Sequence, residues 1–206
     1  MTDQASLAGE DFLSTLPLRA QNLLNAARRL LVDEGFSSLK WERIAKEADE
    51  PKAMIRYYFK DTAGLLSVLL RVLSEEAMHE LIELSEALPT GPERIHAAVA
   101  GLQEATRQPW YMTIFEVLPR ALHDDALRAQ IAEAYCRYRQ MNQTCFGVTP
   151  TAENAADLAA LASLFSAAAD GIAIQAALDP LGFDADPVFA KVEQAFRVLL
   201  RDAEQA

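Results

Sequence analysis

The chain has few cysteines, few histidines and no metal-binding motif. Cys136 and Cys145 are the only two cysteines in 206 residues, so neither a disulfide framework nor the cysteine pairs of a zinc site is predicted. His79, His96 and His123 are far apart in the chain and lack a metal-ligand spacing. We therefore expect no metal, no cofactor and a reducing cytoplasmic setting.

Long apolar runs and catalytic motifs are also missing. No apolar stretch approaches the roughly 20 residues that a membrane span requires. The opening segment MTDQASLAGEDF is acidic and polar, unlike a secretory signal. The sequence has no phosphate-binding loop and no Gly-x-Ser-x-Gly elbow. These absences predict a soluble protein that is neither membrane-bound nor an enzyme.

Positive charge is scarce over the whole chain but concentrated in one region. The formal net charge is −11. Between Arg19 and Lys60 there are nine Lys/Arg and six Asp/Glu, which gives +3, whereas the remainder has ten against twenty-four, which gives −14. DNA binding depends on local phosphate neutralisation, so an acidic body does not exclude it.

Helical periodicity dominates and predicts an all-α fold of about nine helices. Apolar residues from Leu16 to Leu31 recur at steps of three and four, as in an amphipathic helix that ends at Gly35. The prolines after it punctuate further helical stretches. We expect an N-terminal domain at residues 1–60 and a helical body at residues 61–206.

Two short helices follow the first one. Ser37 and Ser38 are expected to cap a helix over residues 40–48, and Pro51 begins another that reaches Tyr58. A long fourth helix then starts near residue 61. Two short helices joined by a tight turn and braced by a longer one form a helix-turn-helix.

The second short helix has the composition of a DNA-reading surface. Ile55 and Phe59 are expected to point inward. Lys and Arg side chains bind phosphates or guanine edges, tyrosine hydroxyls donate to phosphate, and a small residue lets the backbone approach the bases. A solvated basic face is the alternative interpretation. The expected DNA-binding residues are Lys40, Arg43, Lys52, Ala53, Met54, Arg56, Tyr57, Tyr58 and Lys60.

The segment LLNAARRLLVDEGFSSLKWERIAKEADEPKAMIRYYFKDTAGLLSVLL resembles the N-terminal domain of the TetR family of repressors. Its matching features include Gly35-Phe36, Ile44-Ala45, Tyr58-Phe59 and Leu65-Leu66. The body is similar to the BetI-type subgroup. The resemblance implies a homodimeric repressor that binds a palindromic operator in double-stranded DNA and responds to a small-molecule effector.

The turn between the two short helices departs from the family pattern. Asp49-Glu50-Pro51 stands where the family usually has Gly-Val-Ser, and two carboxylates beside a groove-reading helix disfavour phosphate. The sequence therefore keeps open a helical ligand- or protein-binding module with a degenerate head that does not bind DNA.

Aromatic residues in the body predict a small-molecule pocket. Aromatic rings with a few polar tips form such pockets, although core packing is the alternative for each residue. Cation–π contacts and carboxylates at Glu116, Glu133 and Asp170 favour a cationic ligand. The expected pocket residues are Trp110, Tyr111, Phe115, Tyr135, Phe165 and Asp170.

The last two helical stretches predict a subunit interface. Small residues in 154–178 allow a second helix to approach closely, and the final helix has a one-sided apolar stripe. Two such helices from each subunit would form a four-helix interface. The expected interface residues are Leu158, Ala162, Phe165, Ala169, Val192, Phe196 and Leu199.

Overall fold

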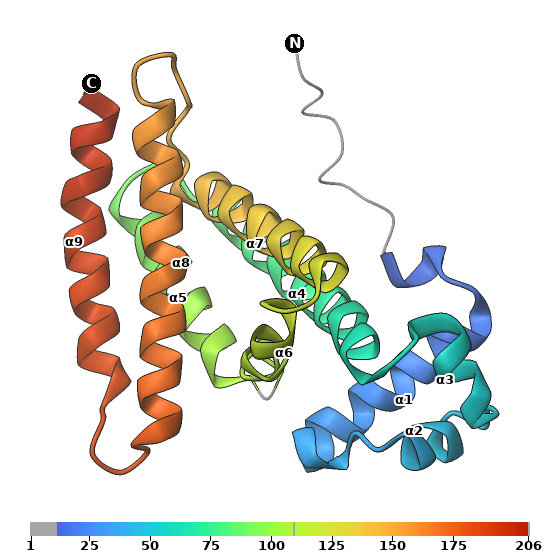
Figure 1. Cartoon of the computed structure of the whole chain (residues 1–206). Coiled ribbons are helices and arrows are strands. Elements are labelled where there is room, and N and C mark those ends of the chain that lie inside the picture. The colour runs from blue at the N-terminus through green and yellow to red at the C-terminus, as the bar shows by residue number, and fades with distance from the viewer. Residues whose placement is uncertain (1–11, 109, 206) are drawn as a thin grey trace. The chain divides into compact units, whose positions relative to one another are not determined.

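A computed structural model describes residues 12–108 and 110–205, apart from the side chains of residues 76, 77, 80 and 205. Within these ranges all regular elements are helical and no β-strand occurs, which confirms the predicted all-α fold (Figure 1). The α-helices are α1 (Leu18–Glu34), α2 (Trp41–Glu47), α3 (Lys52–Phe59), α4 (Thr62–Glu86), α5 (Pro92–Arg107), α6 (Thr113–Ala121), α7 (Asp125–Phe146), α8 (Ala155–Leu178) and α9 (Ala185–Gln205). Two short 3-10 helices, η1 (Phe12–Thr15) and η2 (Phe36–Ser38), flank α1.

The chain forms two compact units. The first comprises Met1–Glu75 and Thr113–Arg128, and the second comprises Glu76–Met112 and Ala129–Ala206. Helix α4 therefore starts in the first unit and continues into the second. The functional division into residues 1–60 and 61–206 stays a prediction.

The core of the first unit is built on the inner face of α1. Seven α1 residues are buried, and α1 contacts both α2 and α3. Ile44 on α2 and Ile55 on α3 are fully buried, and Phe59 is nearly so. Burial of one such side chain contributes about 1.5–3 kcal/mol. The buried α1 residues, at helical spacing, are Ala20, Leu23, Leu24, Ala26, Ala27, Leu30 and Leu31.

The connection from α1 to α2 differs from the predicted serine cap. Gly35 ends α1 with φ 79° and donates its N–H to the Leu31 carbonyl, as expected. Lys40, however, is the N-cap residue of α2, and it makes no side-chain capping bond. Ser38 instead donates its hydroxyl backward to the carbonyls of Leu30 and Gly35, at 2.8 and 2.7 Å. Because Ser38 belongs to η2 and Leu39 and Lys40 separate it from α2, this serine secures the end of α1 and does not cap α2.

The core of the second unit lies between α5, α7, α8 and α9. Figure 1 shows α8 and α9 side by side, and α5 contacts both helices. Phe146, Phe165 and Phe196 pack their rings with centroids 4.8–5.8 Å apart. Aromatic pairs of this kind add about 0.5–1.5 kcal/mol beyond their area burial.

This core corrects the predicted subunit interface. The chain itself buries five of the predicted interface residues, so they are inside the second unit and not on its surface. Val192 is partly buried against the same core, and Leu199 is 38% exposed. The five buried residues are Leu158, Ala162, Phe165, Ala169 and Phe196.

Helix α8 is more apolar than we expected of any stretch in the sequence. By length and composition alone α8 is apolar enough to cross a membrane, with a mean hydropathy of 1.5, and 39% of its most apolar window is buried in the chain. Its inner side packs on α5 and α9. Its apolar character is therefore explained only in part by the core.

Candidate functional site

Helix α3 presents a basic and aromatic face to solvent. Ile55 and Phe59 anchor its inner side in the first unit. Lys52, Arg56 and Tyr57 are exposed on the outer side, and 74% of Tyr57 is accessible. A helix of eight residues anchored in this way can enter a DNA major groove, where such side chains contact phosphates and base edges.

The turn before α3 directs one of its two carboxylates away from this face. Asp49 has φ 53°, in the left-handed region that glycine prefers and aspartate tolerates. The side chain of Glu50 is only 9% exposed and lies 3.7 Å from the Arg19 guanidinium. It also accepts a hydrogen bond of 3.3 Å from the Asn22 amide. The charge of Glu50 is thus neutralised against α1.

Two of the predicted DNA-binding cations form ion pairs within the chain. Lys52 binds Glu42, and Arg43 binds Glu34 through two hydrogen bonds of 2.5 and 2.8 Å. Hydrogen bonds from Arg43 and Lys52 lower the pKa of Glu34 and Glu42 respectively. All four groups are exposed to solvent, where such pairs are weak and exchange readily.

The other predicted DNA-binding residues divide by exposure. Lys40, Arg56 and Lys60 are exposed and make no ion pair with any residue that the structure describes. Ala53 is exposed, whereas Met54 and Tyr58 are partly buried. The Met54 sulfur lies 3.9 Å from the Arg19 guanidinium, and the Tyr58 ring packs edge-on against Tyr57.

The junction between α3 and α4 is tightly packed. A Cβ added to Gly64 would lie 2.1 Å from the Phe59 carbonyl oxygen, so only glycine fits there. Asp61 caps α4 by accepting the Gly64 N–H at 3.0 Å. The other oxygen of Asp61 accepts a bond of 2.5 Å from Arg120 on α6. Helix α6 is therefore bound to the end of α3.

A partly buried carboxyl group, Asp170, lies in the second unit. The hydroxyls of Tyr111 and Tyr135 donate to the two oxygens of Asp170, at 2.9 and 2.8 Å. Burial raises the pKa of Asp170 above its usual range, although the two tyrosines lower it in part. Burial also raises the pKa of both hydroxyls, which stay protonated. Among the described residues Asp170 forms no salt bridge.

One further buried polar atom of α7 lacks a partner. The Asn142 carbonyl oxygen is buried without a hydrogen bond in the part of the chain that is described, whereas the Tyr138 hydroxyl interacts with the Tyr111 side chain. The Asn142 amide donates to Ser166 at 2.9 Å. Unpartnered buried polar atoms cost stability and are characteristic of ligand sites. No group of three or more metal-binding side chains occurs among the residues described.

Two parts of the chain match known families. Residues 23–69 match bacterial regulatory proteins of the tetR family, and residues 91–201 match the C-terminal domain of BetI-type transcriptional repressors. The chain belongs to the TetR family. The first match contains α2 and α3, and the second contains Asp170 and its two tyrosines.

The relatives of this TetR-family chain include sequences and solved structures. It is 28% identical over 97 residues, 46% of its length, to the HTH-type transcriptional regulator BetI of Klebsiella pneumoniae (strain 342), and it spans 50% of that relative. The multidrug binding protein EbrR, complexed with imidazole, has a TM-score of 0.58 at 22% identity, with 91% and 96% of the two chains covered. A protein from Saccharomonospora viridis in complex with choline has a TM-score of 0.61 at 21% identity, with 86% and 94% covered. These two likenesses show the fold.

The structure brings together only some of the predicted pocket residues. Trp110 packs on Tyr111 with a ring distance of 5.7 Å, and both belong to the second unit, as do Tyr135 and Asp170. Phe115 belongs to the first unit. Phe165 is corrected, because it is buried in the phenylalanine core.

Two of the carboxylates that favoured a cationic ligand in the sequence lie at the surface. Glu116 is exposed, and Glu133 binds Arg137 at the surface. The sequence interpretation missed Tyr138 and Asn142. Their signal was a spacing of three and seven residues from Tyr135 along α7.

We predict that Asp170→Asn raises the melting temperature by a few degrees at pH 8 and by less toward pH 4. The pKa of Asp170 is higher in the folded state than in the unfolded state, so the folded protein keeps this proton to higher pH. The stability of the wild-type protein therefore falls as pH rises from the ordinary aspartate range through the raised pKa. The neutral amide does not ionise. Thermal unfolding from pH 4 to pH 8 measures the difference, with the exposed Asp202→Asn as control. A difference that does not depend on pH would contradict the buried-charge interpretation.

Proposed function

We propose that this TetR-family protein is a cytoplasmic DNA-binding repressor whose operator affinity is controlled by a small-molecule effector. The observation that carries the proposal is the outer face of α3, where Lys52, Arg56 and Tyr57 are exposed on a helix anchored by Ile55 and Phe59. The family match over residues 23–69 supports it. The domain at residues 1–60 is proposed to bind DNA, and residues 61–206 to bind the effector and the second subunit.

Operator binding exchanges intramolecular ion pairs for phosphate contacts. Lys52 leaves Glu42 and Arg43 leaves Glu34, which releases carboxylates close to the DNA. Arg56 is free of such a partner among the described residues and is proposed to contact bases or phosphates directly. Affinity is then a balance between new phosphate contacts and the carboxylates left beside them.

We predict that Arg56→Ala weakens operator binding by roughly 1–3 kcal/mol and that Glu42→Gln strengthens it several-fold. The first change removes a contact, and the second removes a competitor for Lys52. Fluorescence anisotropy with labelled DNA from upstream of the gene, at several salt concentrations, measures both. Lys191→Ala on α9 is the matched control for loss of a positive charge.

The outcomes distinguish a DNA-binding repressor from a protein whose degenerate head does not bind DNA. Specific binding with a steep salt dependence, lowered by Arg56→Ala and unaffected by Lys191→Ala, supports the repressor. Binding that is equally weak on every duplex, with or without effector, would show that the head does not recognise DNA.

The effector is proposed to be a small organic cation held at Asp170. A partly buried carboxylate without a salt bridge among the described residues attracts a cation, and the rings of Trp110, Tyr111 and Tyr135 offer cation–π contacts. The relative from Saccharomonospora viridis is in complex with choline, which has this chemistry.

Chain connectivity links this cluster to the head. Tyr111 precedes the start of α6 by two residues, and Arg120 near the end of α6 binds Asp61 beside α3. A ligand that displaces Tyr111 from Asp170 acts on α6, and the Arg120–Asp61 pair passes the change to the α3–α4 junction. Such coupling requires only about 1–3 kcal/mol of differential affinity.

We predict that choline and tetramethylammonium change operator affinity at least fivefold, whereas 3,3-dimethylbutan-1-ol does not. The alcohol has the shape of choline without its charge, so it tests the electrostatic contribution of Asp170. Asp170→Asn should bind DNA normally and lose the response. Equal effects of choline and the alcohol, or an unchanged response in Asp170→Asn, would reject a cationic effector at this residue.

A homodimer is proposed to form through the outer faces of α8 and α9. Leu164 on α8 and Val198 on α9 are each 52% exposed. A Cβ added to Gly171 would meet nothing within 4 Å, so the chain's own packing does not require that glycine in the middle of a helix. The α8 residues that recur on this side are Ala160, Leu164, Ala167, Gly171, Ile174 and Leu178.

We predict that Leu164→Glu and Val198→Glu each convert the dimer to a monomer and abolish tight binding to a palindromic operator. Two α3 helices must lie about 34 Å apart to reach successive major grooves, and a monomer supplies only one. Light scattering after gel filtration measures the mass. Leu122→Glu, at a residue that is 69% exposed in the other unit, is the control. A wild-type protein that is already monomeric would overturn this part of the proposal.

A further inference from the structure

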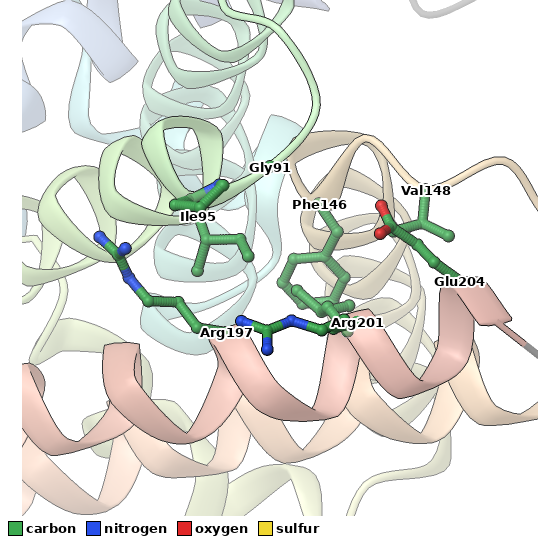
Figure 2. A pocket seen from close by; sticks show the side chains of 9 residues that line it. Gly91, Ile95, Phe146, Val148, Arg197, Arg201 and Glu204 are labelled. Carbon is green, nitrogen blue, oxygen red and sulfur yellow. The ribbon is translucent and has the colours of Figure 1, made fainter.

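A second concave site lies in the second unit, at the start of α5 (Figure 2). Three segments line it, and Figure 2 shows the side chain of Arg201 extended along α9, whereas that of Arg197 rises from α9 beside Ile95. The lining residues are Gly91, Pro92, Ile95, Phe146, Val148, Arg197, Leu200, Arg201 and Glu204.

The walls of this site are held in place by hydrogen bonds. Arg94 on α5 donates to the carbonyls of Thr144 and Cys145 at the end of α7, at 2.8 and 3.1 Å. Thr90 donates to the Gly147 carbonyl at 3.1 Å. Gly147 has φ 73°, a backbone conformation that favours glycine, and its Cα faces the Arg94 side chain. These contacts hold the three segments together.

The floor is apolar and the rim is cationic. Ile95, Phe146 and Leu200 are almost fully buried by the chain, so the hollow, of about 70 Å³, offers a ligand only a narrow apolar strip, which suits a short hydrocarbon. Arg197 is held by Glu193 at 2.5 Å. Arg201 is exposed and forms no ion pair with a described residue, so its guanidinium can bind a ligand carboxylate through two hydrogen bonds.

The charge of this site is opposite to that of its surroundings. Outside residues 19–60 the chain has ten Lys/Arg against twenty-four Asp/Glu. Arg94, Arg197 and Arg201 lie on or beside this one site. Glu204 lines its far end next to Val148, where it would repel a second carboxylate.

We propose that this site binds a small monocarboxylic acid with a short apolar body. Arg201 would bind the carboxylate, the apolar floor would bury the body, and Glu204 would disfavour dicarboxylates. The site selects an anion, whereas the Asp170 cluster selects a cation, so this binding is independent of the proposed effector and of DNA.

Isothermal titration of the full-length protein with benzoate and butyrate tests the proposal. Benzyl alcohol and butan-1-ol are the uncharged controls, and benzylamine reverses the charge. We expect the carboxylates to bind and the alcohols and the amine to bind at least tenfold more weakly. Arg201→Gln should lower benzoate affinity about tenfold, the effect of losing a charge-assisted hydrogen bond of about 1.4 kcal/mol. Lys191→Gln, on the same helix, should leave it unchanged.

Two further variants make the result decisive. Glu204→Gln should strengthen benzoate binding several-fold, because it removes the repelling carboxylate. Asp170→Asn should bind benzoate like wild type, which separates this site from the cationic effector site. Absence of benzoate binding at tens of millimolar, equal binding of benzyl alcohol, or unchanged affinity in Arg201→Gln would each overturn the proposal, whatever the outcome of the DNA experiments.

Discussion

The position of α3 depends on the burial of two side chains. The helix has only eight residues, and a helix of that length is not stable alone in water. Ile55 and Phe59 anchor it in a core whose other side is the apolar face of α1. The exposed residues Lys52, Arg56 and Tyr57 acquire a fixed direction only through that anchorage. The direction of this exposed face therefore depends on packing on the opposite side of α3.

The same short helix is also fixed at its C-terminal end. The Phe59 carbonyl reaches so close to Gly64 that no side chain fits, and Asp61 joins the start of α4 to Arg120 of α6. A close backbone approach and one ion pair thereby connect the end of α3 with the start of α4 and with α6.

Charge is arranged locally in this acidic chain. Glu50 pairs with Arg19 and accepts a hydrogen bond from Asn22. Asp170 is a partly buried carboxyl group bonded to two tyrosines, while Arg201 lies at the rim of an apolar hollow. Net charge alone indicates none of these sites, because each depends on a local group and its immediate partners.

Much of the fold was determined by the sequence itself. The stripe of α1, the left-handed glycine at position 35 and the proline before α3 each specify local structure through one to four neighbours. Such short-range signals predicted the helices and the helix-turn-helix. They also indicated which residues of α3 are exposed, because its two inward anchors define the solvent-facing side of the helix.

The tertiary structure alone decided which side of α8 and α9 lies inside. Helix α8 is apolar nearly all round, so its periodicity does not distinguish a core face from a subunit face. Only the helices packed against it place Phe165 in the core and Leu164 at the surface. For the same reason Tyr138, Asn142 and the Arg201 site were not foreseen. Their partners are distant in the chain, and no local pattern specifies which distant residues a helix meets.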